Sequence, residues 1–190
     1  WGRSSPAHTP TLLWNSRWEY DKGPETFFAA LRELKRRAID FRVIVLGEHI
    51  NPRHPTFLAA HEELANHALA WGYAPDLETY RRLLHQADIV VSTAIQEFFG
   101  IAVVEAIYCG CVPLLPDRLS YPELIPSHLH PTCLYHDDEH LADRLCEMIA
   151  ILPDLKRIDF RAIVAGYDWS CMATCYDAAF ADVVTTRGYG

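Results

Sequence analysis

The chain has 190 residues, half of them hydrophobic, which is enough apolar material for one well-filled domain. Its formal net charge of −8 argues against a domain that clamps a polyanion over its whole surface, because affinity for nucleic acids comes mainly from lysine and arginine. No apolar run approaches the length of a membrane span, and none of the six cysteines forms a Cys-x-x-Cys pair, so we expect buried free thiols in a cytoplasmic protein.

The N-terminal part of the chain predicts a strand, a helix and a second strand. Residues 11–18 open with an apolar run, Pro24 occupies a first-turn position that favours a helix start, and residues 41–47 are again apolar. The preceding residues are polar and contain proline. We therefore expect a linker over residues 1–10 and a folded domain over residues 11–190.

Two cations follow the first predicted strand. Arg17 and Lys22 bracket the turn at its carboxyl end, the edge of a parallel sheet at which ligands bind, and both can donate hydrogen bonds to diphosphate oxygens. Taken alone, they are equally consistent with ordinary surface cations. Neither strand is followed by Gly-x-Gly-x-x-Gly or by a P-loop lysine motif, which argues against a dinucleotide oxidoreductase or a P-loop enzyme.

One cluster of basic residues lies at the end of the first predicted helix. They are Arg32, Lys35, Arg36 and Arg37. Cations at this position complement the helix dipole, and we favour this explanation over an RNA-binding patch. Further along, residues 56–69 predict a helix, residues 69–73 a short strand and residues 77–87 an amphipathic helix.

The stretch after the next strand carries the clearest chemical pattern. The apolar run at residues 89–91 predicts a buried strand, and an Ala/Ile/Val-rich segment of helical length follows a polar turn. Gly100 lets a ligand approach the backbone, so the N–H groups of Gly100, Ile101 and Ala102 can hold a phosphate at the helix start.

Two carboxylates flank this position. Glu97 lies in the turn, where it can reach the hydroxyls of a sugar beyond the phosphate, and Glu105 suits the vicinal hydroxyls of a ribose. The pattern predicts a nucleotide-sugar site. The alternative is that Phe98 and Phe99 are core residues and that both glutamates are solvated.

The pair Glu97 and Glu105, with Phe-Gly between them and Cys109-Gly110-Cys111-Val112-Pro113 after them, resembles the paired-glutamate motif of retaining nucleotide-sugar glycosyltransferases of GT-B architecture. Many members carry glycine where Phe98 stands. The resemblance implies an α/β fold with a Rossmann-like, doubly wound parallel sheet, the C-terminal half of such an enzyme. The chain would then be the donor-binding domain of a hexosyltransferase, without the N-terminal acceptor domain and without turnover in isolation.

The resemblance also implies roles for individual residues. By this resemblance, the catalytic residues are Glu97, Arg17 and Lys22. Donor binding falls to Phe99, Gly100, Ile101, Ala102 and Glu105, with Tyr73 and Ala74 beside the nucleobase. A purely structural aromatic at Tyr73 is the alternative. The family uses no cofactor, and no Asp-x-Asp metal motif is visible, so we expect metal-independent transfer.

Residues 14–22 and 97–111 resemble one branch of this family more closely, over about residues 12 to 180. That branch implies GDP-mannose as donor and queuosine in tRNA as acceptor, with the tRNA held through the absent domain. Two alternatives remain open. One is a related enzyme with another nucleotide sugar and a lipid or glycan acceptor, and the other is a non-catalytic nucleotide-binding module.

The C-terminal third predicts mainly helices. Residues 132–135 predict an apolar strand, residues 140–151 and 153–165 two helices, and residues 169–180 a last helix, with Trp169 as a possible interdomain anchor. Five potential metal ligands lie here, but their spacing matches no structural zinc pattern, so we expect no metal site. They are His128, His130, Cys133, His136 and His140.

Overall fold

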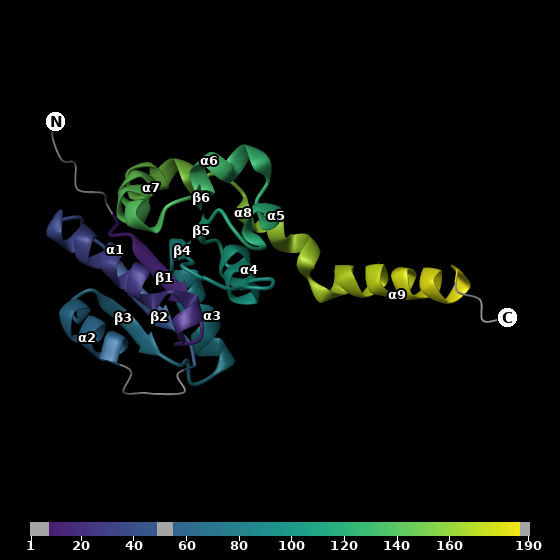
Figure 1. The fold of residues 1–190 in the computed structure, drawn as a ribbon, viewed down its shortest axis with the longest axis horizontal. Helices are drawn as coiled ribbons and strands as arrows, with labels where there is room; N and C mark the ends of the chain where they lie inside the picture. The colour runs from purple at the N-terminus through teal and green to yellow at the C-terminus, as the bar shows by residue number, and fades with distance from the viewer. Residues whose placement is uncertain (1–7, 49–54, 187–190) are drawn as a thin grey trace.

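The computed structural model describes residues 8–48 and 55–186. Within these ranges a six-stranded parallel sheet in the order β3-β2-β1-β4-β5-β6 crosses the domain (Figure 1). The strands are β1 (Thr11–Asn15), β2 (Arg42–Leu46), β3 (Ala68–Gly72), β4 (Ile89–Val91), β5 (Val112–Pro116) and β6 (Leu134–Tyr135). The predicted α/β fold with a doubly wound parallel sheet is confirmed.

Helices cover both faces of the sheet. Contacts group α1 with α2 and α7 in one layer, and α4 with α3 and α8 in the other. The helices are α1 (Pro24–Arg36), α2 (Pro55–Leu64), α3 (Leu77–Gln86), α4 (Ile101–Tyr108), α5 (Tyr121–Leu124), α6 (His130–Cys133), α7 (Leu141–Leu155), α8 (Phe160–Val164) and α9 (Trp169–Thr186). Short 3-10 turns lie at η1 (Tyr20–Lys22), η2 (Ser127–Leu129), η3 (Asp138–His140) and η4 (Ala165–Tyr167).

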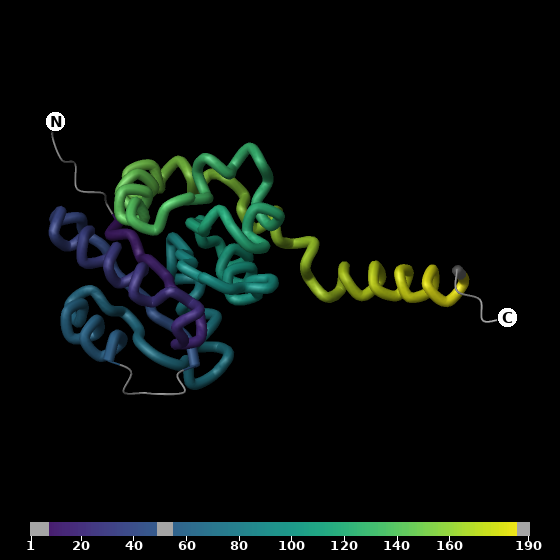
Figure 2. The backbone as a smooth tube through the Cα atoms, viewed as in Figure 1, coloured from purple at the N-terminus to yellow at the C-terminus, as the bar shows by residue number. Residues whose placement is uncertain are grey.

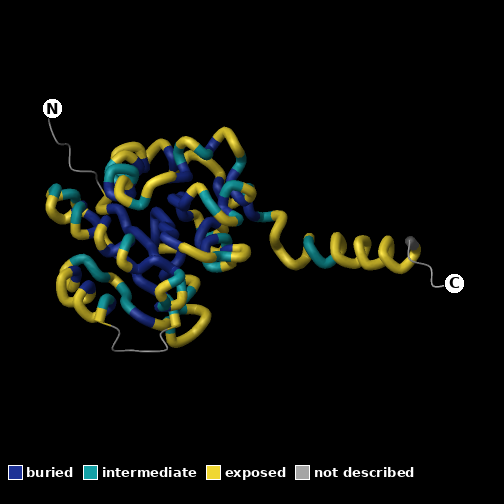
Figure 3. Tube along the Cα trace, in the orientation of Figure 1, coloured by how far each residue is buried: buried dark blue, intermediate teal, exposed yellow. Residues whose placement is uncertain are grey.

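The strands are apolar because both faces of the sheet are covered. Every residue of β1 is buried, and Trp14 packs against Phe27 and Phe57 with ring centroids 6.2 and 5.7 Å apart. Burying such an aromatic side chain is worth about 3 kcal/mol. Figure 3 shows this buried centre, with exposed residues around it.

The strand order places the ligand-binding edge. The chain runs from β1 outward to β3, then returns to the other side of β1, where Leu12 pairs with Ile89 and Leu13 with Val90. The crossovers on the two sides of β1 leave in opposite directions, and in open α/β sheets the ligand crevice is expected at such a point, here where β1 and β4 end. The loops after these two strands, residues 16–23 and 92–100, are called the crevice loops below.

Several predicted boundaries were wrong. The first strand ends at Asn15 rather than at residue 18, because Trp18 turns away to stack on Phe57 at 4.1 Å. Cys133 ends the short helix α6 and is not in a strand. α7 continues through Pro153 to Leu155, and α8 is a separate short helix. Pro153 removes one helical hydrogen bond near the end of α7, where burial of the neighbouring Leu152 and Leu155 favours the helix.

Both ends of the described chain differ from the domain body. The predicted linker lies mostly outside the described residues, and its residue His8 contacts Asp88 at 2.9 Å. At the other end, α9 projects away from the sheet (Figure 2). Trp169 is 71% exposed, and Phe180 and Val184 are exposed as well. The predicted helix is present and extends to Thr186.

Candidate active site

The two crevice loops are held together by hydrogen bonds. The N–H groups of Ile95 and Gln96 donate to the carbonyl of Asp21 at 2.8 and 3.2 Å, and the Thr93 hydroxyl donates to the carbonyl of Lys22 at 2.8 Å. The Trp14 indole N–H donates to the same Thr93 hydroxyl at 3.1 Å. Segments more than 70 residues apart in sequence therefore form one wall of the crevice.

Gly23 allows this close approach. It has φ +58°, and a Cβ at this position would lie 2.3 Å from the carbonyl oxygen of Thr93. A side chain would therefore meet both backbone strain and a clash with backbone atoms. The two crevice loops can therefore approach this closely because residue 23 has no side chain.

The structure brings Lys22 and Glu97 together. The Lys22 side chain is only 10% exposed, and its Nζ lies 3.3 Å from a Glu97 carboxylate oxygen and 3.3 Å from that of Asp21. Nζ also donates to the carbonyl of Gln96 at 2.7 Å. Arg17 lies on the outer part of its loop, more than half exposed, and pairs with Glu19 at 2.8 Å. A largely buried cation thus lies between the two crevice loops, with a second, exposed cation on the first of them.

The loop after Glu97 leads into α4 through Gly100. Gly100 has φ +85°, and a Cβ there would lie 3.1 Å from the Tyr121 ring. The N–H groups of Val103 and Val104 donate to the carbonyl of Gly100. Ile101 and Ala102 stand in the first turn of α4, whose N–H groups have no acceptor within the helix. Their position at the carboxyl edge of β4 is suited to an anion.

Phe98 and Phe99 are not core residues, so that part of the alternative was wrong. Phe98 is 90% exposed, and Phe99 is partly exposed and packs edge-on against Tyr167 at 5.1 Å. The N–H of Phe98 donates to the Glu97 carboxylate at 3.0 Å. Glu97 is therefore oriented by its own loop as well as by Lys22.

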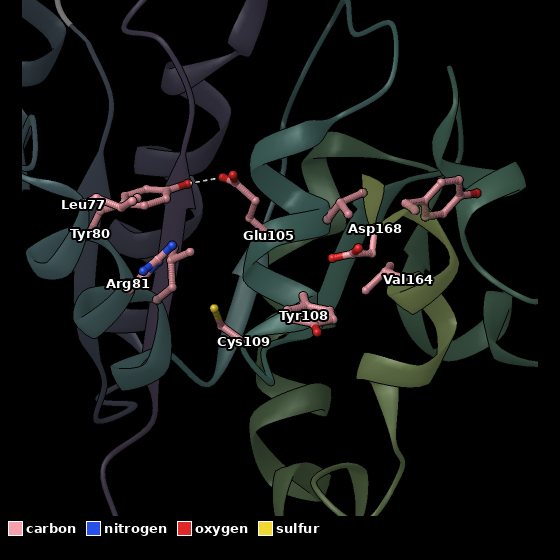
Figure 4. Close-up of a pocket in the computed structure, with 11 residues that line it drawn as sticks. Leu77, Tyr80, Arg81, Glu105, Tyr108, Cys109, Val164 and Asp168 are labelled. Carbon is pink, nitrogen blue, oxygen red and sulfur yellow. Dashed lines mark hydrogen bonds between the residues drawn. The ribbon is translucent and has the colours of Figure 1, made fainter. Parts of the chain in front are cut away.

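Glu105 lies in the second turn of α4 and is held by α3. One of its carboxylate oxygens accepts a hydrogen bond from the Tyr80 hydroxyl at 2.6 Å (Figure 4). The Asn15 amide at the end of β1 donates to the same hydroxyl at 2.8 Å. Burial, and then the hydrogen bond to Glu105, raise the pKa of Tyr80 well above its usual value, so the hydroxyl stays protonated at neutral pH.

A cavity of about 380 Å³ adjoins Glu105, between α3, α4 and the segment from α8 to the start of α9 (Figure 4). Tyr73 and Ala74, the nucleobase candidates, do not line it. They line a second cavity of about 270 Å³ against β3 and other side chains of α3, and the Tyr73 side chain is largely exposed. The sites predicted for the ribose and for the base therefore open on two different cavities beside α3.

Sequence reasoning missed three supporting residues. Tyr80 and Asn15 were missed because their contact depends on how α3 packs near the end of β1, which the sequence pattern does not give. Arg118 follows β5 and donates to the carbonyl of Ala94 at 3.1 Å and to Asp138 at 3.1 Å, which ties a third loop to the crevice. For Tyr80, the signal available in the sequence was a side chain with a hydroxyl group on the apolar face of the predicted amphipathic helix.

The basic cluster on α1 is neutralised by acids. Arg32 pairs with Glu63, while Arg36 and Arg37 pair with Glu33, and Arg37 also reaches Asp143. The hydrogen bonds from Arg36 and Arg37 lower the pKa of Glu33 to about 2. The structural explanation of the cluster is favoured over an RNA patch.

The candidate metal ligands near the C-terminus have separate partners. His130 contacts the carbonyls of Pro122 and Ile125, His136 pairs with Asp117, and His140 pairs with Asp137. Within residues 8–48 and 55–186, no three His, Cys, Asp or Glu side chains are placed to share a metal ion. No helix in the same ranges combines the length and apolar character needed to cross a membrane.

Comparison with known proteins places this geometry in a family. The family model "Glycosyl transferases group 1" matches residues 3–162. The chain is 40% identical over 115 residues to the tRNA-queuosine alpha-mannosyltransferase of Drosophila melanogaster, covering 60% of this chain and 30% of that protein. It is 26% identical over 188 residues to the GDP-mannose:cellobiosyl-diphosphopolyprenol alpha-mannosyltransferase of Xanthomonas oryzae pv. oryzae, covering 96% of this chain and 49% of that protein.

Among solved structures, sucrose-phosphate synthase from Thermosynechococcus elongatus superposes with a TM-score of 0.76 at 19% identity, covering 95% of this chain and 47% of that one. This likeness confirms the GT-B-like fold. The chain spans less than half the length of the two curated relatives. Because the family model covers most of the sequence, the chain belongs to the group 1 glycosyl transferases.

Proposed function

We propose that this chain is the donor-binding domain of a retaining, metal-independent glycosyltransferase that transfers mannose from GDP-mannose to queuosine in tRNA. The observation that carries the proposal is the largely buried Lys22 against Glu97 in the crevice between β1 and β4. A cation that is shielded from water yet faces a ligand-binding edge is suited to a diphosphate, and an adjacent carboxylate is suited to sugar hydroxyls.

The chemistry of transfer follows from these positions. When the bond between the sugar and the diphosphate breaks, negative charge develops on the leaving GDP and positive charge on the mannose. Lys22, Arg17 and the first-turn N–H groups of α4 would stabilise the diphosphate. Glu97 would orient the mannose through its hydroxyls, and Glu105 would hold the ribose. The acceptor oxygen would bond to the anomeric carbon of mannose on the face from which the diphosphate leaves, and the leaving phosphate would take the proton of the acceptor hydroxyl. Attack on that same face retains the configuration.

The identity of donor and acceptor is inferred from the relatives. Both curated relatives are mannosyltransferases, and the name of one of them includes GDP-mannose. The greater identity, 40%, is to the enzyme named for tRNA-queuosine, and this favours a tRNA acceptor. Because this chain spans 30% of that relative, we assign acceptor binding to a further domain. We also propose a cytoplasmic location, where tRNA and GDP-mannose are both available.

A second candidate keeps the donor and changes the acceptor. The similarity to the Xanthomonas enzyme covers nearly the whole chain, and that protein is named for a diphosphopolyprenol-linked glycan. A lipid-linked acceptor therefore remains the alternative. Transfer assays with tRNA and with lipid-linked glycan, in a protein containing both domains, would separate the two.

Calorimetry with GDP, UDP and ADP tests the donor assignment on this chain. We expect binding that prefers GDP and is weakened by Arg17→Ala and by Glu105→Ala. Arg157→Ala and Glu62→Ala are matched controls, because Arg157 is also an exposed arginine in an ion pair and Glu62 is also an exposed helical glutamate. Equal or absent binding of all three nucleotides would contradict the GDP assignment. We further expect no turnover of GDP-mannose by these 190 residues alone.

A further inference from the structure

We propose that Tyr80 is a positioning residue that holds the carboxylate of Glu105 in place for the ribose hydroxyls of the donor nucleotide. The inference rests on the proposed function, which assigns ribose binding to Glu105. It adds a residue from a different helix, and a reason why the nucleotide would be recognised through its ribose.

The hydrogen bonds around Tyr80 have a defined direction. The Asn15 amide donates to the Tyr80 hydroxyl at 2.8 Å, so the hydroxyl oxygen acts as an acceptor there. The hydroxyl proton is then available for the Glu105 carboxylate, 2.6 Å away. Asn15 is 7% exposed at the end of β1, so the chain of contacts begins at a fixed point in the sheet. Through Tyr80, the end of β1 therefore fixes the position of the Glu105 carboxylate on α4.

Glu105 needs such support because it lies on the exposed face of α4. A free glutamate samples several rotamers, and fixing them on ligand binding costs about 1 to 2 kcal/mol. The contact with Tyr80 fixes one carboxylate oxygen before the ligand arrives. An ionised carboxylate has about four acceptor positions. Tyr80 uses one of them, and a pair of vicinal hydroxyls can use the others.

The pair of Tyr80 and Glu105 lies where a ligand can reach it. Tyr80 and Glu105 line the same cavity, and the apolar side chains of Leu77 and Val104 lie on its wall beside them. Figure 4 shows the Tyr80 hydroxyl directed at the Glu105 carboxylate from across the cavity. The pair is exposed to solvent, so the strength of this contact comes from the carboxylate acceptor, which makes the hydrogen bond charge-assisted.

Binding of GDP and of 2′,3′-dideoxy-GDP to this chain, measured by calorimetry, tests the role of Tyr80. We expect the wild type to prefer GDP and Glu105→Ala to lose that preference. Tyr80→Phe keeps the ring and removes only the hydroxyl. We expect it to reduce the preference for GDP by about three- to tenfold, with the affinity for 2′,3′-dideoxy-GDP unchanged. Tyr108→Phe is the matched control, because its hydroxyl lies in the same cavity and accepts from Arg161 instead.

The outcomes separate this inference from the proposed function. If Glu105→Ala removes the ribose preference and Tyr80→Phe keeps it, Tyr80 has no positioning role and only this inference is overturned. If Tyr80→Phe weakens both nucleotides by the same factor, its role is structural and the inference is again overturned. If the wild type binds no nucleotide, or Glu105→Ala keeps the preference, the assignment of Glu105 in the proposed function fails as well.

Discussion

The crevice loops and α9 are built in opposite ways. In the loops, polar groups are buried and paired, as with Lys22, Ser92 and Thr93. In α9, large apolar side chains such as Trp169 and Phe180 are exposed. Both regions lie outside the sheet, and within residues 8–48 and 55–186 hydrogen bonds between distant residues join the loops to it. The stability of the domain and the shape of the site should therefore depend on the loops and hardly on α9.

The largest expected effect comes from Gly23→Ala. The new Cβ would overlap the carbonyl of Thr93, and alanine disfavours the positive φ at this position. We expect a loss of about 3 kcal/mol or more in the free energy of unfolding, measured by denaturant titration. Gly166→Ala is the control, because a Cβ there meets nothing within 4 Å. A stability of Gly23→Ala equal to that of the control would show that the loops can separate freely.

Next in size is the loss of nucleotide affinity in Lys22→Met. Methionine keeps the length of the side chain and removes the charge that faces Glu97 and Asp21. We expect GDP to bind about 10- to 100-fold more weakly, as for the loss of a charge-assisted hydrogen bond to phosphate. The measurement is calorimetric titration, with Lys35→Met as the control on the surface of α1. Unchanged affinity would place the diphosphate elsewhere.

Cysteine reactivity gives a third comparison of the domain body with α9. Burial raises the pKa of Cys111 and of Cys133 to about 12, above that of the unfolded chain, so both stay protonated and unreactive from pH 7 to 9. Cys171 and Cys175 are exposed on α9. Mass spectrometry after timed alkylation should find these two modified first, and Cys111 and Cys133 only after unfolding. Early modification of Cys111 would mean that the sheet opens locally.

The smallest effect is expected on α9 itself. Phe180→Ala removes an exposed ring and should change the free energy of unfolding by less than about 0.5 kcal/mol. The comparison is Phe27→Ala, a fully buried ring beneath β1, which should cost about 3 to 5 kcal/mol. Thermal unfolding of both variants checks the difference. A large loss in Phe180→Ala would contradict the separation of α9 from the core.

Local patterns in the sequence predicted the sheet well, because each buried strand is a short apolar run. They also predicted that Lys22 and Glu97 belong to one site, through the family resemblance. They did not predict the contact of Tyr80 with Glu105, because it depends on how the strand order of the sheet places α3 beside α4. The strand predicted over residues 132–135 is present only at Leu134 and Tyr135, and the helix predicted over residues 153–165 is interrupted between Leu155 and Phe160, for a similar reason. Their local preferences were weaker than the burial of neighbouring side chains.

The central position of β1 also has a consequence for folding. The contacts of β1 and its loop with Thr93 span 71 to 79 residues, so the crevice cannot form until the chain has been synthesised beyond β4. Until then, β1 is an edge strand with one unpaired side, and Leu12 and Leu13 are incompletely covered. Such distant pairing slows folding and exposes apolar surface to aggregation. The arrangement that builds the crevice therefore makes it a late product of folding, and the nascent chain is most vulnerable before residue 89 has docked.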